Sequence, residues 1–283
     1  MTMTSAMEST VYARHGTVEL SLDLFRPADG GHGAAILLFH GGGWRAGAKE
    51  FVHERAAALA AAGFTAAAVQ YRLLDVAPWP APLADARAAL SWVRGHADEL
   101  EIDPGKVIIQ GHSAGAHIAL MTGTVDVAER PAAIVAYYPP AGFRQAVPPP
   151  PGGPPPFPLE TDELGRIPGW MLFPPEAPQA ELDAASPVTL ADAAFPPTVL
   201  FHGTADSAVH FRSSAALHRR LLELGVSSEL HVYADRDHEF DMAPSMRQAT
   251  VAATASFLDR VVTRREESAA EAREYPFPPS VGQ

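Results

Sequence analysis

The chain of 283 residues contains no cysteine, which excludes disulfide bonds, thiolate metal sites and a cysteine nucleophile. It also lacks the uninterrupted run of about 18 apolar residues that a membrane-spanning helix requires. The first residues, MTMTSAMESTVYARHG, have neither the basic start nor the apolar centre of a secretory signal. We therefore expect a cytoplasmic protein without a membrane partner.

Basic residues are few, because 21 Lys and Arg stand against 33 Asp and Glu, a formal net charge of -12. Nucleic acids and anionic membranes are bound by clusters of Lys and Arg, so the charge argues against both as partners. The hydrophobic fraction of 47% and the charged fraction of 19% are typical of a globular domain of enzyme size.

Strand and helix patterns alternate along the chain. Short, continuous apolar runs are typical of strands buried on both faces, and they occur at residues 34–39, 65–71, 106–110, 133–137 and 198–201. Residues 17–25 alternate apolar and polar residues after a polar leader and predict an edge strand, and residues 229–233 predict the last strand. Helix-like stretches lie between these runs, at residues 50–62, 82–96, 114–124, 213–224 and 249–265. This alternation predicts an α/β fold with a mostly parallel sheet and helices on both faces, formed by a single domain over residues 1–283.

Proline is concentrated in one segment, residues 139–197, which holds 17 of the 27 prolines and includes VPPPPGGPPPFP at residues 147–158. The strand pattern resumes at residue 198, so an insertion over the sheet explains the segment better than a linker between two domains. We expect it to form a lid or a pocket wall, with Trp170 among the apolar side chains that face a substrate.

Ser113 lies at the centre of the sequence Gly-His-Ser-Ala-Gly, between an apolar strand and an apolar helix. A strand, a sharp turn and a helix are what a nucleophile elbow requires. The backbone at such a turn is strained and crowded, which explains Gly111 and Gly115. Ser113 is therefore the candidate nucleophile.

Three consecutive glycines follow the apolar run at residues 34–39, in the sequence His-Gly-Gly-Gly-Trp at residues 40–44. Glycine weakens both helices and strands, so this loop must need bare backbone for another reason. Backbone N–H groups can stabilise the oxyanion of an acyl transfer. The candidate donors are Gly42, Gly43 and Ala114. The glycine patterns that bind nucleotide phosphates are absent.

A serine nucleophile needs a base and a carboxylate that orients it. His238 follows the last predicted strand, and Asp206 follows the strand at residues 198–201, so both would lie at carboxyl ends of strands. The order Ser113, Asp206, His238 is the order found in α/β-hydrolases. Asp235 and Asp237 are weaker candidates for the orienting carboxylate, and His40 is expected to organise the glycine loop. Supporting roles are left open for His117, His202 and His210.

The sequences HGGGW, GHSAG and HGTAD with DHEF resemble the hormone-sensitive-lipase-like and the feruloyl or acetyl-xylan esterase-like branches of the α/β-hydrolase superfamily, over residues 18–258. The resemblance implies an eight-stranded, mostly parallel sheet, no cofactor or metal, and cleavage of small carboxylic esters through a Ser-His-Asp triad and an acyl-enzyme. It also implies that Gly42 and Gly43 supply oxyanion donors.

The chain departs from these families at Ala116, where most members have glycine, and at His112, where many have aspartate. Feruloyl-esterase-like and kynurenine-formamidase-like members often have a histidine at the second position. The predicted substrate-binding residues are Trp44, His112 and Trp170. Amidase, arylformamidase or lyase chemistry at the same site, a non-catalytic binding protein and a homodimer are left open.

Overall fold

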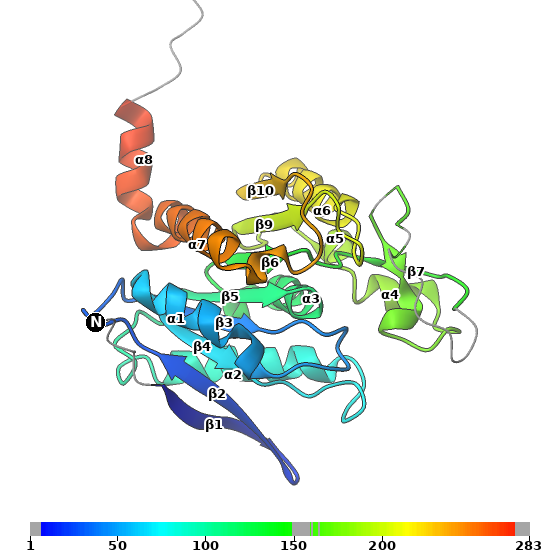
Figure 1. Cartoon of the computed structure of the whole chain (residues 1–283), viewed down its shortest axis with the longest axis horizontal. Coiled ribbons are helices and arrows are strands. Elements are labelled where there is room, and N and C mark those ends of the chain that lie inside the picture. Colours follow the sequence, from blue (N-terminus) through cyan, green and yellow to red (C-terminus); the bar gives the residue numbers. More distant parts are fainter. Residues whose placement is uncertain (1–6, 149–158, 160, 164, 275–283) are drawn as a thin grey trace, which may run out of the picture.

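A computed structural model describes residues 7–148, 159, 161–163 and 165–274 (Figure 1). Eight strands form one sheet in the order β1-β2-β4-β3-β5-β6-β9-β10, in which β1 pairs with β2 and β2 with β4 in antiparallel fashion, and all other pairs are parallel. The strands are β1 (Glu8–His15), β2 (Val18–Phe25), β3 (Ala35–Phe39), β4 (Thr65–Val69), β5 (Val107–His112), β6 (Ile134–Tyr137), β9 (Thr198–Gly203) and β10 (Ser228–Tyr233). The predicted fold class is confirmed.

The edge of the sheet differs from the prediction. Residues 17–25 were expected to form the edge strand, but β1 lies outside them and pairs with β2. Tyr12 is the only buried residue of β1, and its hydroxyl donates to the carbonyl of Gln70 at 2.6 Å. A strand with one buried side chain has no apolar alternation, so its sequence resembles a polar leader.

Helices cover both faces of the sheet and define two cores. The helices α1 (His53–Ala61) and α7 (Pro244–Leu258) pack on one face, and α2 (Ala81–Gly95), α3 (Ala114–Met121) and α6 (Arg212–Glu223) pack on the other. Successive side chains of β3 point alternately into the two cores, since Ile36 and Leu38 belong to one and Leu37 and Phe39 to the other. This double burial explains why the strand is apolar throughout.

The proline-rich segment joins the core on the α3 and α6 face. It contains β7 (Phe143–Arg144), β8 (Ile167–Pro168), the 3-10 helix η4 (Gly169–Met171), α4 (Gln179–Asp183) and α5 (Pro187–Leu190). Phe143, Ile167 and Leu182 are buried in the same cluster as α3. Most of the proline run at residues 147–158, namely residues 149–158, lies outside the described residues.

The C-terminal helix is shorter than predicted at its end and longer at its start. Helix α7 begins at Pro244, and a π-helix at Asp259–Thr263 separates it from α8 (Arg265–Glu274). None of the α8 side chains is buried, and Figure 1 shows this helix extending away from the sheet. The remaining short helices are η1 (Lys49–Val52), η2 (Thr122–Thr124), η3 (Val127–Glu129) and η5 (Phe240–Met242). Within the described ranges, no helix has the length and apolar character needed to cross a membrane.

Candidate active site

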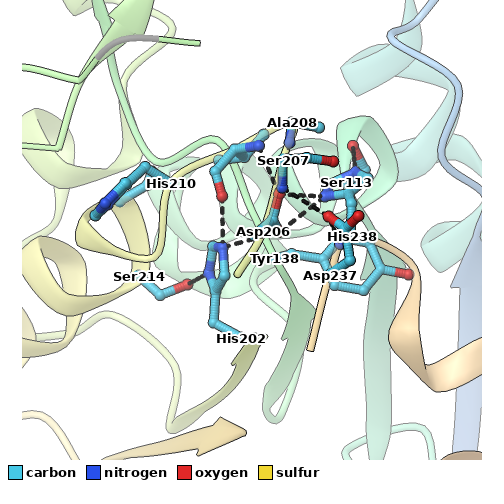
Figure 2. A network of polar contacts seen from close by, with 12 residues as sticks. Ser113, Tyr138, His202, Asp206, Ser207, Ala208, His210, Ser214, Asp237 and His238 are labelled. Carbon is cyan, nitrogen blue, oxygen red and sulfur yellow. Dashed lines mark hydrogen bonds and ion pairs between the residues drawn. The ribbon is translucent and has the colours of Figure 1, made fainter. Parts of the chain in front are cut away.

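The candidate residues meet where parallel strands end. Ser113 follows β5, Asp206 follows β9 and His238 follows β10, and the glycine loop follows β3. Parallel strands have their carboxyl ends at the same edge of the sheet, so loops that are distant in sequence come together there. Figure 2 shows the three side chains in one connected polar network.

Ser113 occupies the strained turn that its sequence predicts. Its backbone has φ 51° and ψ -116°, and its N–H donates to the carbonyl of Tyr137 at 2.9 Å. A Cβ atom at Gly111 would overlap the carbonyl oxygen of Gly115, and one at Gly115 would overlap that of Phe39. The expected need for residues without side chains on either side of the turn is thus confirmed.

His238 bridges Ser113 and Asp206 (Figure 2). Its Nε2 lies 3.0 Å from Ser113 Oγ, and its Nδ1 lies 3.0 and 2.9 Å from the two carboxylate oxygens of Asp206. Because a carboxylate only accepts, Nδ1 carries the proton and Nε2 is free to accept the Ser113 hydroxyl proton. The Tyr138 ring packs beside His238, with centroids 4.4 Å apart.

The Asp206 side chain is fully buried and amply hydrogen-bonded. Its Oδ1 also accepts the backbone N–H groups of Ala208 and Val209 at 2.9 and 2.8 Å. Burial alone would raise the pKa of Asp206, but hydrogen bonds from His202 and His238 outweigh it and leave this pKa lowered. Asp206 is therefore an anion at neutral pH.

The two alternative carboxylates do not reach the imidazole ring. Asp237 Oδ1 accepts the backbone N–H groups of Ser207 and His238 at 2.7 and 2.6 Å, so it organises the loop. Asp235 is exposed, and its own N–H donates to Thr204 Oγ1 at 2.9 Å.

The glycine loop adopts conformations that favour glycine, most strongly at Gly42. Gly42 has φ 113° and Gly43 φ 59°, and a Cβ at Gly42 would overlap the carbonyl of Ala46. Among the described residues, the N–H groups of Gly42, Gly43 and Ala114 donate to no protein acceptor. These donors are available to a ligand at Ser113.

His40 holds the loop from behind. Its Nδ1 lies 2.7 Å from the carbonyl of Gly41, its own carbonyl accepts the Tyr71 hydroxyl at 3.0 Å, and its ring stacks on that of Tyr71. A Cβ at Gly47 would overlap the His40 ring. These contacts fit the organising role expected for His40.

A small, mainly apolar cavity of about 190 Å³ opens beside Ser113. Its wall includes Ser113 and His238, three residues of the glycine loop and four of the proline-rich segment, namely Gly42, Gly43 and Trp44, and Pro140, Leu159, Ile167 and Met171. Of the three predicted substrate-binding residues, only Trp44 lines this cavity. Trp170 and its neighbour Met171 both pack against the core, but only Met171 lines the cavity.

His112 is turned away from the cavity, contrary to its predicted contact with substrate. Its ring stacks on Tyr137, and its Nε2 lies 3.3 Å from Asp241 Oδ2. Asp241 is buried and also accepts hydrogen bonds from Arg55 at 2.6 Å and from the Tyr138 hydroxyl at 2.7 Å. No local sequence pattern marked this network, because its members come from distant segments.

Asp241 is ionised within this network. Burial alone would raise the pKa of Asp241, but His112, Arg55 and the Tyr138 hydroxyl outweigh burial and leave its pKa lowered. The network links the loop that carries His238 to α1, which lies on the opposite face from the proline-rich segment.

The histidines with open roles lie in different surroundings. His117 is fully buried on α3, its Nε2 donates to the carbonyl of Ala185 at 2.8 Å, and burial lowers its pKa to about 4. His210 Nδ1 accepts the N–H of Arg212 at 3.2 Å. His202 contacts Asp206. Across the described ranges, no cluster of three or more His, Asp or Glu side chains could hold a metal ion.

Comparisons with known proteins show the family to which the chain belongs. The family model BD-FAE matches residues 22–221. The carboxylic ester hydrolase LipM of Mycobacterium tuberculosis, described as probable, is 30% identical over 88% of this chain and 60% of its own length. A non-reducing polyketide synthase of Penicillium brasilianum, prhL, is 24% identical over 85% of this chain, which spans only 13% of that protein.

Solved structures of an esterase have the same fold. The thermophilic esterase Est2 of Thermogutta terrifontis is 27% identical, with a TM-score of 0.74 over 91% of this chain and 93% of its own. Other structures of that esterase hold butyrate or are phosphoramylated by tabun. The sequence resemblance is confirmed. Because the family model matches well over half of the chain, this protein belongs to the BD-FAE family and has the α/β-hydrolase fold.

Proposed function

We propose that the protein is a serine hydrolase that cleaves small carboxylic esters through an acyl-enzyme. The observation that carries the proposal is the alignment of Ser113 Oγ, His238 Nε2 and the buried Asp206, with hydrogen-bond distances of 2.9 to 3.0 Å. A nucleophile in contact with a base, which is itself oriented by a third group, is the pattern of nucleophilic catalysis. The similarity to LipM and to Est2 supports an ester as substrate.

In the proposed reaction, His238 Nε2 takes the Ser113 hydroxyl proton while Oγ attacks the ester carbonyl carbon. The tetrahedral intermediate collapses as the carbon–oxygen bond to the alcohol breaks, and His238 returns its proton to the leaving alkoxide. Water then attacks the acyl-enzyme with His238 as base, releasing the acid and restoring Ser113. Asp206 keeps Nδ1 protonated and stabilises the transient imidazolium.

The free N–H groups of Gly42, Gly43 and Ala114 support the same reaction. They flank Ser113, so they are suited to bind the carbonyl oxygen once it becomes negative. Donors fixed where charge develops are worth about 3 kcal/mol each. Glycine at positions 42 and 43 permits the positive φ angles on which this arrangement depends.

The size and lining of the cavity favour a short substrate. A volume of about 190 Å³ lies below the roughly 300–1,000 Å³ that is usual for drug-sized ligands. We propose that residues 139–197 act as a pocket wall within a single domain, because Pro140, Leu159, Ile167 and Met171 contribute to the lining. The butyrate complex of Est2 is consistent with a short acyl group.

Shortening Met171 should extend the range of accepted substrates. Met171 Cε would lie 3.9 Å from a Cβ built on Gly43, so this side chain limits the space beside the oxyanion donors. We expect Met171→Ala to raise kcat/KM for p-nitrophenyl hexanoate relative to acetate by about tenfold, since each methylene placed in an apolar pocket is worth about 1–3 kcal/mol.

The matched control is Trp170→Ala, the neighbouring residue that does not line the cavity. We expect this variant to leave the ratio of hexanoate to acetate turnover within about twofold of the wild-type ratio. A larger change for Trp170→Ala than for Met171→Ala would contradict the assignment of the wall.

The proposed function is tested by labelling with a fluorophosphonate probe, followed by mass spectrometry of the digested protein. We expect one adduct, on the peptide containing Ser113, and hydrolysis of p-nitrophenyl acetate at a higher kcat/KM than that of N-formyl and amide analogues. An unlabelled Ser113 would refute the serine hydrolase. Preferential turnover of N-formylarylamines would replace the esterase with an arylformamidase that uses the same site.

A further inference from the structure

A second histidine lies against Asp206, on the side opposite His238 (Figure 2). His202 belongs to β9 and is completely buried. Its Nε2 lies 2.7 Å from the carbonyl oxygen of Val209 and 3.1 Å from Asp206 Oδ2. Its Nδ1 lies 2.7 Å from the hydroxyl of Ser214 on α6. Every polar atom of the ring is therefore in contact with a buried partner.

These contacts determine which nitrogen carries the proton. Nε2 faces a carbonyl and a carboxylate, which only accept, so it is the protonated nitrogen. Its N–H is directed to Val209, and Asp206 Oδ2 lies beside the same proton. Nδ1 accepts the Ser214 hydroxyl proton, so α6 prevents the ring from flipping.

We propose that His202 is a positioning residue for Asp206, an inference that rests on the proposed function. Asp206 and Val209 are the ends of a tight turn. Asp206 Oδ1 accepts the N–H of Val209 at 2.8 Å, and the carbonyl oxygen of Val209 accepts the Nε2–H of His202. The ring closes this turn, so the carboxylate keeps the orientation in which it meets His238 Nδ1.

The same ring also holds part of the cavity wall. Val209 lines the cavity and forms a β-bridge with Leu159 of the proline-rich segment. His202 thereby connects the orientation of the candidate base with the position of the wall. A rotation of the turn would disturb both at once.

An effect of His202 on His238 must pass through Asp206. Of the residues that the structure describes, the charged or titratable groups near His238 are Asp206, Asp237, Glu239 and Tyr138, and those near His202 are Asp206 and His210. Asp206 is the only member of both sets. Loss of the His202 N–H would leave the Asp206 charge less stabilised, so Asp206 would hold the protonated His238 more tightly.

The test compares His202→Phe, which removes the N–H donor, with His202→Gln, whose amide can donate to Val209. We expect His202→Phe to lower kcat for p-nitrophenyl acetate about tenfold with KM within about twofold, as loss of a supporting hydrogen bond typically does. The acid limb of the kcat/KM profile should move to higher pH by about half a unit. His202→Gln should recover most of both effects.

The control is His117→Phe, which also removes a fully buried imidazole that donates to a carbonyl, that of Ala185, but has no contact with Asp206. We expect the acid limb of the kcat/KM profile of His117→Phe to stay within about 0.2 pH unit of the wild-type position, even if this variant is less stable than the wild type. If His202→Phe does not fold, His202→Asn replaces it, because the shorter amide cannot reach Val209. An unmoved acid limb in a folded His202 variant without the donor, or no recovery in His202→Gln, would overturn the proposal.

A second measurement does not depend on turnover. The proton between His238 Nδ1 and Asp206 can be followed by NMR in the resting protein labelled with ¹⁵N-histidine. We expect its resonance to shift in His202→Phe and to stay in His117→Phe, and an unchanged resonance in both would overturn the proposal. If the wild-type protein fails to hydrolyse esters, the proposed function fails, and this resonance still reports on His202.

Discussion

Replacing Ser113 by alanine is expected to lower kcat for p-nitrophenyl acetate by about 10⁵- to 10⁶-fold, the loss seen when the nucleophile of a triad is removed. The Ser113 hydroxyl is held by His238 Nε2 at 3.0 Å and caps no helix N–H. The substitution therefore removes the attacking atom without removing a structural hydrogen bond. Alanine at φ 51° is no more strained than serine, so we expect the free energy of unfolding to change little.

The measurement is steady-state hydrolysis beside urea denaturation of both proteins. The control is Ser91→Ala, the same chemical change at an exposed position of α2, for which we expect wild-type kcat. Residual activity of Ser113→Ala above about 1% of wild type would contradict its role as the nucleophile.

Replacing Asp241 by asparagine is expected to lower the free energy of unfolding by about 3–5 kcal/mol, the usual result of removing one partner of a buried ion pair. Arg55 and Asp241 have side chains only 4% and 0% exposed, and 2.6 Å separates their charged atoms. In this variant the buried guanidinium has no anionic partner. Asparagine replaces one of the two carboxylate oxygens by an NH2 group, which cannot accept, so either Arg55 or the Tyr138 hydroxyl loses its side-chain acceptor.

The control for this variant is Glu19→Gln, which breaks a pair with Arg14 in which the side chains are 58% and 66% exposed. Surface pairs contribute about 0–1 kcal/mol, so we expect a small change in the urea midpoint. The double variant Arg55→Met with Asp241→Asn should recover part of the loss, because the uncompensated charge is then gone. A loss below about 1 kcal/mol in Asp241→Asn would show that water reaches Arg55.

The loops that carry Ser113 and the candidate oxyanion donors Gly42 and Gly43 could be predicted because their constraints are local. A serine between two glycines, after an apolar strand and before an apolar helix, predicts a strained turn from these few residues alone. The same holds for the glycine loop after β3, where the positive φ angles of Gly42 and Gly43 favour glycine. The meeting of Asp206 and His238 followed from strand order, since parallel strands bring their carboxyl ends to one edge.

Elements whose burial is one-sided or slight were harder to predict. Strand β1 buries only Tyr12, so nothing in its pattern separated it from a leader. In the proline-rich segment, the sequence marked an apolar group near the cavity, but Trp170 and Met171 are adjacent. Only the tertiary structure decides that Met171 lines the cavity and Trp170 does not, since both side chains pack against the core.

The sequence by itself determined the fold class, the order along the chain of the loops that carry the candidate residues, and the backbone conformation at Ser113, Gly42 and Gly43. Hydrophobic periodicity and the conformational preference of glycine depend on only a few neighbouring residues. Tertiary structure alone decided that the His112 side chain faces Asp241, that His202 contacts the carbonyl of Val209, and that the cavity beside Ser113 is small. These outcomes depend on contacts between distant segments, such as the pair formed by Arg55 and Asp241, 186 residues apart. No local pattern records such a contact, since each partner is an ordinary polar residue until the fold buries it.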